Sequence, residues 1–217
     1  MPARSTTPTR PLRRDAQANH DRIVAAAHAA FAADGVEVSV EEIARRAAVG
    51  MGTLYRHFPT KEDLVDAVLE DTFDEIVGAA EHALTEQDAW RGLSSFLERF
   101  FALHVQNRGL KDMLATRAHG RERADAMRAR MRPLIRHLVA RAQQQGTLRA
   151  DFAPEDMPFV IWSVGRVIEE TRAVAPELWR RHLGFLLDGL RADAATPLPQ
   201  PPLTRAQLDR VTERRHR

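Results

Sequence analysis

The stretch SVEEIARRAAVGMGTLYRHFPTK, from Ser39 to Lys61, decides the fold of the N-terminal part of this chain. Ser39 followed three residues later by Glu42 is typical of a helix capping box and predicts the start of a short helix. The small residues at 48–50 predict a turn, and Pro59 limits the next helix to about two turns. Two short helices joined by such a turn predict a helix-turn-helix, which places its second helix in the DNA major groove.

The second of these helices should bury one side and expose the other. Leu54 and Phe58 are four residues apart, so they should share the face that packs on the core. The outward set then suits phosphates and base edges, and it comprises Met51, Thr53, Tyr55, Arg56 and His57. The alternative is an ordinary helical hairpin whose arginine and histidine are merely solvated.

At these residues the chain resembles the TetR family of bacterial one-component repressors. The resemblance rests on Gly50, Thr53-Leu54-Tyr55, Phe58 and the helix start at Lys61-Glu62, and it covers roughly residues 15–70. It implies that Met51, Gly52, Thr53 and Arg56 contact base edges, that Tyr55, His57 and Lys61 contact phosphates, and that Ser39 presents a helix N-terminus to the DNA backbone. Gly50-Met51-Gly52 departs from family patterns that carry Gln or Arg here, which leaves Arg56 as the side chain able to bind guanine bidentately.

No segment alternates as a strand does, so we expect an all-α fold of about nine helices. It should consist of an N-terminal three-helix helix-turn-helix domain and a C-terminal helical bundle for ligand binding and dimerisation. The expected divisions are a disordered basic arm at 1–14, a DNA-binding domain at 15–59, a ligand-binding and dimerisation domain at 60–195 and a flexible tail at 196–217. The arm carries four arginines and no acid, so it could track phosphates or be a solvated tail.

Composition excludes several classes of protein. The chain has no cysteine, which rules out disulfides and thiol redox sensing, and its nine histidines are scattered, so we expect no metal site and no cofactor. No run is long and apolar enough for a membrane span, and we expect a cytoplasmic protein without membrane contact. No motif with a catalytic mechanism is present, so we expect no enzyme.

Two sets of residues in the C-terminal part are candidate sites. An apolar effector could be lined by Phe100, His104, Met127, Met131 and Trp162, with Arg166 as a polar anchor. The last two long helices could form a dimer interface through Ile161, Gly165, Ile168, Leu183, Leu186, Leu187 and Leu190. The plainer alternatives are core packing for the apolar residues and a surface ion pair with Glu169 or Glu170 for Arg166.

Together these patterns predict a sequence-specific transcriptional regulator. It should bind a palindromic double-stranded DNA operator as a homodimer and be released by an unknown apolar small molecule. A DNA-binding protein that needs no ligand is the main alternative, and a helical carrier of lipids or small molecules, or an enzyme, is a more distant one.

Overall fold

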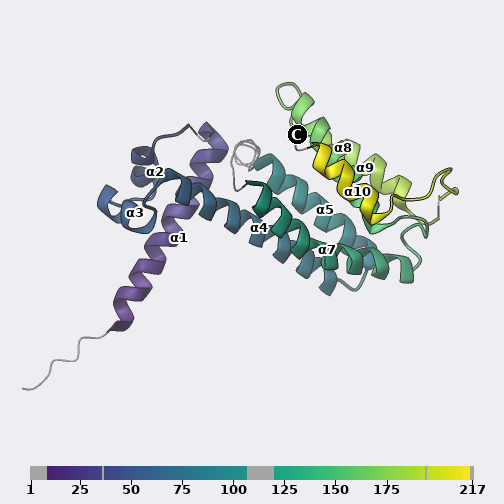
Figure 1. The fold of residues 1–217 in the computed structure, drawn as a ribbon, viewed down its shortest axis with the longest axis horizontal. Helices are drawn as coiled ribbons and strands as arrows, with labels where there is room; N and C mark the ends of the chain where they lie inside the picture. The colour runs from purple at the N-terminus through teal and green to yellow at the C-terminus, as the bar shows by residue number, and fades with distance from the viewer. Residues whose placement is uncertain (1–8, 36, 107–119, 194, 216–217) are drawn as a thin grey trace, which may run out of the picture. The chain divides into compact units, whose positions relative to one another are not determined.

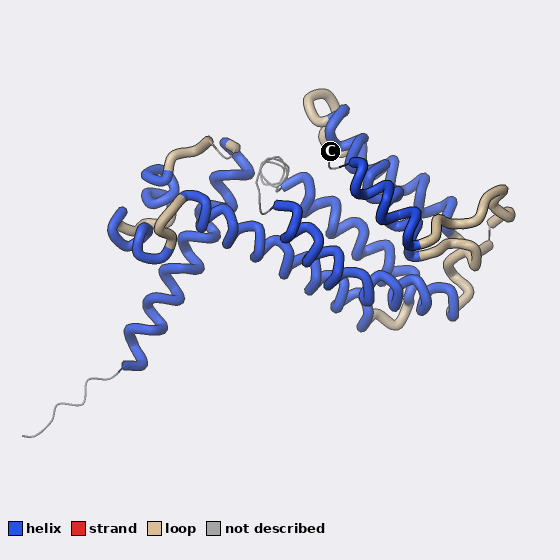
Figure 2. Tube along the Cα trace, in the orientation of Figure 1, coloured by secondary structure: helices blue, strands red, loops and turns tan. Residues whose placement is uncertain are grey.

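The computed structural model describes residues 9–35, 37–106, 120–193 and 195–215. Within these residues the chain is all-α, as predicted, with nine α-helices, a short 3-10 helix and no strand (Figures 1 and 2). The helices are α1 (Thr9–Asp34), α2 (Val40–Arg46), α3 (Met51–His57), α4 (Lys61–Thr85), α5 (Ala89–Gln106), α7 (Gly120–Gln144), η1 (Pro154–Asp156), α8 (Met157–Thr171), α9 (Leu178–Leu190) and α10 (Arg205–Arg215). The spacing of Leu110, Met113 and Leu114 in the sequence predicts a further short helix, and these residues lie outside the described ranges.

The described residues up to Thr72 form one compact unit. Its helices each bury apolar side chains at helical spacing, among them Ile23 and Phe31 of α1, Ile43 of α2 and Leu54 of α3. The first turns of α4 belong to this unit and bury Leu64, Val65, Val68 and Leu69. The structural division therefore falls inside α4, later than the division predicted at Pro59.

The second unit starts at Phe73 and contains the rest of α4 with α5, α7, α8, α9 and α10. Its core is one continuous cluster in which the aromatic side chains Phe96, Phe101 and Trp179 are almost fully buried. Gly92 allows α5 to approach the end of α4, because a Cβ atom at this position would lie 2.4 Å from the carbonyl oxygen of Ala83.

Helix α1 begins at Thr9, six residues before the start predicted at Asp15. Residues 1–14 were predicted to be disordered because they are rich in Pro, Thr and Arg, and one of these prolines is Pro11. A proline in the first turn removes no helical hydrogen bond, however, because the first four N–H groups of a helix have no partner within it. The helix can therefore begin ahead of Pro11.

The C-terminal segment differs from the flexible tail predicted for residues 196–217. Thr204 and Gln207 form a reciprocal capping box, in which the Thr204 N–H donates to the Gln207 side chain at 2.8 Å and the Gln207 N–H donates to the Thr204 hydroxyl at 3.4 Å. Helix α10 follows, and its Leu208 is only 5% exposed. Because several prolines precede Thr204, the sequence was interpreted as a flexible tail from residue 196 onward, and α10 was not predicted.

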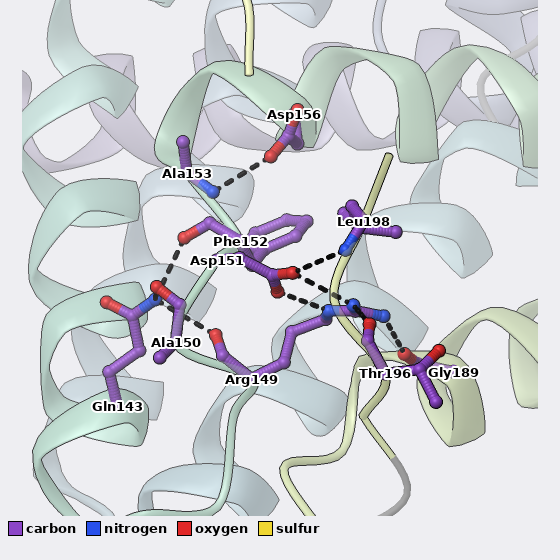
Figure 3. A network of polar contacts seen from close by, with 10 residues as sticks. All are labelled: Gln143, Arg149, Ala150, Asp151, Phe152, Ala153, Asp156, Gly189, Thr196 and Leu198. Carbon is purple, nitrogen blue, oxygen red and sulfur yellow. Dashed lines mark hydrogen bonds and ion pairs between the residues drawn. The ribbon is translucent and has the colours of Figure 1, made fainter. Parts of the chain in front are cut away.

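A polar cluster fastens the start of this segment to α9 and to the loop after α7, within the second unit (Figure 3). The Arg149 guanidinium is almost buried and donates to both carboxylate oxygens of Asp151, at 2.6 and 3.1 Å. It also donates to the carbonyl oxygen of Gly189 in the last turn of α9 and to that of Thr196. Asp151 in turn accepts a hydrogen bond from the backbone N–H of Leu198 at 3.2 Å. We call Arg149 and Asp151 the C-terminal clamp.

The clamp predicts that Asp151→Asn loosens the C-terminal segment. The variant keeps the size of the side chain but removes the charge that holds Arg149, which leaves a nearly buried guanidinium without its only acidic partner among the described residues. Trypsin should then cleave at Arg205 and Arg210 faster than in the unmodified protein. Asp209→Asn is the matched control, because it removes only the exposed pair between Arg205 and Asp209.

The same variant has a defined pH dependence. The Arg149 guanidinium lowers the pKa of Asp151 from 3.8 to about 2. A carboxyl group whose pKa is depressed by folding stabilises the native state above its ordinary pKa and loses that contribution as pH falls toward the folded value. The difference in stability between the unmodified protein and Asp151→Asn should therefore be constant above about pH 5 and shrink between about pH 4 and 2. A difference that stays constant down to pH 2 would contradict the ion pair.

Candidate nucleic-acid interface

Helices α2 and α3 have the geometry that the sequence predicts. The Ser39 hydroxyl accepts a hydrogen bond from the backbone N–H of Glu42 at 3.2 Å and so caps α2. The turn passes through Ala48, whose φ of 53° is in the left-handed region that glycine adopts most easily. Gly50 precedes α3, and its carbonyl oxygen accepts the N–H groups of Thr53 and Leu54.

The two faces of α3 separate as expected. Leu54 is 1% exposed and Phe58, just beyond the helix, is 4% exposed, so both anchor α3 in the core of the first unit. Tyr55 is 46% exposed, and Gly52 and Arg56 are also exposed.

The remaining predicted DNA contacts lie at the edges of this face. Met51, Thr53, His57 and Lys61 are half-buried, whereas Ser39 is exposed. The predicted residues therefore share one short segment, and Tyr55 and Arg56 are its most accessible large side chains.

Both arginines of α2 are already neutralised within the protein. Glu42 accepts two hydrogen bonds from Arg45, at 2.7 and 2.6 Å, and one from Arg46 at 2.7 Å. Hydrogen bonds from Arg45 and then Arg46 lower the pKa of Glu42 to about 2. Arg46 also donates to Asp34 at 2.6 Å, which links α2 to the end of α1. Sequence reasoning assigned Glu42 to the other half of the capping box, but its carboxylate is taken up by these two guanidinium groups.

Arg56 and Lys61 have a different electrostatic setting. In the described ranges neither side chain takes part in an ion pair. A cation without an internal acidic partner can bind a phosphate or a base without breaking an existing pair, which makes these two residues the strongest candidates for contacts with DNA.

Sequence reasoning missed a contact between α1 and the end of α3. The ring of His20 lies 5.0 Å from that of Phe58 and 6.1 Å from that of His57, measured between centroids. His20 precedes Ile23 by three residues, so its place on the buried side of α1 was a detectable signal. The contact fixes α1 beside the C-terminal end of α3.

The predicted effector residues are only partly brought together. The rings of Phe100 and His104 are stacked with centroids 6.4 Å apart, and a Cβ at Gly165 would lie 3.9 Å from Nε2 of His104, so α5 and α8 meet here. Met127 and Met131 are half-buried against the core, and Trp162 packs edge-on to Phe159 with centroids 5.1 Å apart.

Arg166 does not face this interior. Its side chain is 71% exposed and pairs with Glu170 at 2.5 Å, which is the surface ion pair that the sequence left as the alternative. A separate surface hollow of about 420 Å³ is lined by Thr85, Glu86, Gln87, Asp88 and Arg91, and none of the predicted effector residues contributes to it.

The predicted dimer residues also divide into two groups. Ile168 and Leu183 are 2% and 1% exposed, and Gly165 is buried, so these three are covered within one protomer. Ile161, Leu186, Leu187 and Leu190 are half-buried. The apolar side chains that α8 and α9 expose are Phe159, Leu178 and Phe185, which sequence reasoning did not select because it followed the inward stripes.

Among the residues that the structure describes, no group of three or more His, Cys, Asp or Glu side chains is arranged to hold a metal ion. None of the helices in the described ranges is long and apolar enough to cross a membrane.

Comparisons with known proteins agree with this geometry. A family model described as bacterial regulatory proteins, tetR family, matches residues 23–68, and one described as transcriptional regulator SbtR-like, C-terminal domain, matches residues 88–192. An HTH-type transcriptional regulator of Staphylococcus aureus (strain USA300) is 45% identical over 64 residues, which is 29% of this chain and 35% of that protein. The chain thus matches about a third of the length of the curated relative.

Two solved structures are similar over almost their whole length. The TetR transcriptional regulator SCO0520 from Streptomyces coelicolor is 28% identical with a TM-score of 0.64, and the match covers 81% of this chain and 99% of that one. The TetR transcription regulatory protein from Mycobacterium vanbaalenii is 35% identical with a TM-score of 0.68, over 83% of this chain and 99% of that one. With a helix-turn-helix at its N-terminus and this degree of identity over a complete relative, the chain belongs to the TetR family of transcriptional regulators.

Proposed function

We propose that this regulator is a repressor that binds a palindromic operator as a homodimer in the cytoplasm and leaves it when a small apolar effector binds. The observation that carries the proposal is the exposed face of α3, on which Arg56 has no internal acidic partner within the described ranges. A core-anchored helix with such a face suits insertion into a major groove.

The proposed DNA contacts divide by chemistry. Arg56 has the fork of donors that binds guanine bidentately, and Met51, Gly52 and Thr53 supply shape and shorter contacts at base edges. Tyr55, His57 and Lys61 contact phosphates, and the N-terminal end of α2 at Ser39 meets the backbone. Specificity should depend most on Arg56 and general affinity on the phosphate contacts.

Arg56→Ala and Lys61→Ala should therefore have different effects. On a duplex that the unmodified protein selects from a random-sequence pool, Arg56→Ala should cost on the order of 1–3 kcal/mol and relax base preference. Lys61→Ala should weaken binding to selected and scrambled duplexes alike and reduce the salt slope by about 1. Gel-shift titrations measure both. Arg172→Ala, an exposed arginine of the second unit, is the control, and unchanged affinity in both test variants would refute the assignment.

The dimer is proposed to form through the exposed apolar residues of α8 and α9. Leu178 and Phe185 are 40% and 60% exposed, and Phe159 is 39% exposed. Large apolar side chains that stay accessible in a protomer favour a partner surface. A two-fold dimer would present two copies of α3, so the operator should contain two half-sites about one helical turn apart or a little more.

Leu178→Glu combined with Phe185→Glu should give a monomer. The glutamates are tolerated in the free protomer because both positions are exposed, but they would be desolvated at an apolar interface. Multi-angle light scattering measures the mass, and gel shifts should show a parallel loss of operator affinity. Val211→Glu alters an exposed apolar residue of α10 and should remain dimeric. A folded double variant that is still a dimer would place the interface elsewhere.

The effector is proposed to bind where α5, α7 and α8 contribute deformable side chains. Phe100 stacked on His104, the half-buried Met127 and Met131, and Trp162 are its walls. Methionine and aromatic side chains adapt to several ligand shapes, while His104 offers a polar group for orientation. Arg166 is left out because it is exposed and paired with Glu170.

A ligand that binds there should change the fluorescence of Trp162. A screen of apolar and cationic compounds would first identify one that displaces the selected duplex. Binding of that compound should no longer change the tryptophan fluorescence in Trp162→Phe, whereas the change should persist in Trp90→Phe. Both variants should still bind DNA. Release also requires weaker affinity for the DNA-bound dimer, because a ligand with equal affinity for both states shifts no equilibrium. If no compound releases the duplex, the effector proposal is withdrawn and only the DNA-binding proposal is kept.

A further inference from the structure

A polar contact joins α8 to α9 on the side that faces away from the core. The Ser163 hydroxyl and Nε2 of His182 are hydrogen-bonded at 2.7 Å. Both side chains are half-buried. In the described ranges no carboxylate forms an ion pair with His182, so nothing among these residues offsets a positive charge on its ring.

His182 lies within the apolar surface through which the protein is proposed to dimerise. Leu178 is four residues before it and Phe185 three residues after it, so the three side chains project from the same side of α9. Both apolar residues remain exposed in the protomer, and Phe159, the exposed aromatic residue of α8, is four residues before Ser163. An interface that covers these apolar side chains would therefore also cover the hydrogen-bonded pair.

The charged neighbour of this histidine on its own helix is a cation. Arg181 precedes His182 directly, and its guanidinium lies 4.9 Å from the centroid of the Phe185 ring. Within the described residues Arg181 forms no ion pair. A proton on the histidine would therefore add a second positive charge to the same part of α9.

The charged groups of the neighbouring helices do not favour that proton either. On α8, Arg166 is paired with Glu170 at 2.5 Å and approaches Glu169 at 3.9 Å, so both carboxylates already have a cation. The titratable group of α5 is His104, which lies beside Gly165. This glycine is two residues after the serine of the pair and therefore on the opposite side of α8.

The pair gives the proposed interface a group whose charge depends on pH. A histidine ring changes charge between about pH 8 and pH 5. Covering a charged ring with apolar side chains costs far more than covering a neutral one, so the dimer excludes a proton that the free protomer can hold in water. Because the free protomer then binds more protons than the dimer, a lower pH favours the free protomer.

We infer that His182 makes dimerisation of this protein sensitive to pH, with a stable dimer at neutral pH that dissociates on acidification. The Ser163 hydroxyl holds the neutral ring in place between the two helices. Since an operator with two half-sites needs two copies of α3, acidification would release the DNA without any small molecule. The inference rests on the proposed dimer through α8 and α9, and it concerns the regulation of that interface.

The test is the dissociation constant of the dimer, measured by sedimentation equilibrium between about pH 7.5 and about pH 5.5. For the unmodified protein it should rise by up to about 100-fold for each pH unit below the range in which the free histidine titrates, because each of the two protomers takes up a proton. His182→Gln keeps a hydrogen-bonding side chain that cannot be charged, so its dissociation constant should not depend on pH. The matched control His137→Gln changes an exposed histidine of α7 and should keep the pH dependence.

A dissociation constant of the unmodified protein that is the same at all these pH values overturns the inference. A pH dependence that persists in His182→Gln also overturns it. If the glutamine variant does not fold, calorimetric dilution of the unmodified dimer at about pH 6.5 decides, because separating protomers that take up protons remove them from the buffer. The heat of dissociation should then differ between phosphate and imidazole buffers, and equal heats contradict the inference. If Leu178→Glu combined with Phe185→Glu remains dimeric, the proposed interface itself is refuted.

Discussion

The anchoring of α3 by Leu54 and Phe58 is the constraint on which the DNA-binding unit depends. A helix of seven residues is not stable alone in water, where isolated helices need about 12–15 residues. It persists because both side chains are buried in the core of the first unit. Whatever orients these two anchors also orients Tyr55 and Arg56 on the opposite face, so packing inside the unit sets the geometry of the DNA contacts proposed for these two residues.

The charge distribution of the same unit favours discrimination between DNA sequences over general affinity for DNA. Glu42 takes up both arginines of α2, and the depressed pKa of its carboxyl group keeps it charged at all physiological pH values. An α2 with two unpaired arginines would attract any duplex, because phosphate contacts carry no sequence information. Compensating these charges locally leaves Arg56 as a cation of α3 without an acidic partner among the described residues, which suits the base contact proposed for it.

The sequence predicted those parts of the fold in which local chemistry and periodicity agree. The Ser39 cap, the turn before Gly50 and the burial of Leu54 follow from residue types a few positions apart, and each is present in the structure. The Thr60 and Asp63 capping box that starts α4 was predictable for the same reason.

Errors arose where the outcome depends on contacts that periodicity does not encode. An apolar stripe does not state whether its own protomer or a partner covers it, so Ile168 and Leu183 were assigned to an interface although the protomer buries them. Arg166 lies on an otherwise apolar helix, but it is on the exposed face of that helix and pairs with Glu170. The electrostatic role of Glu42 was missed because the capping box and the ion pairs compete for one carboxylate.

The C-terminal clamp shows how a contact can be retained while sequence changes. Arg149 and Asp151 hold residues 196–198 through the carbonyl oxygen of Thr196 and the N–H of Leu198, both of which are backbone groups. Mutations in that segment can therefore accumulate without loss of the contact, provided that no proline replaces Leu198. The side chains of residues 196–198 can therefore change in evolution while Arg149 and Asp151 are conserved. Homologues that share this attachment need have no identical residue in the segment that corresponds to 196–198. A sequence alignment alone would therefore not detect the shared contact.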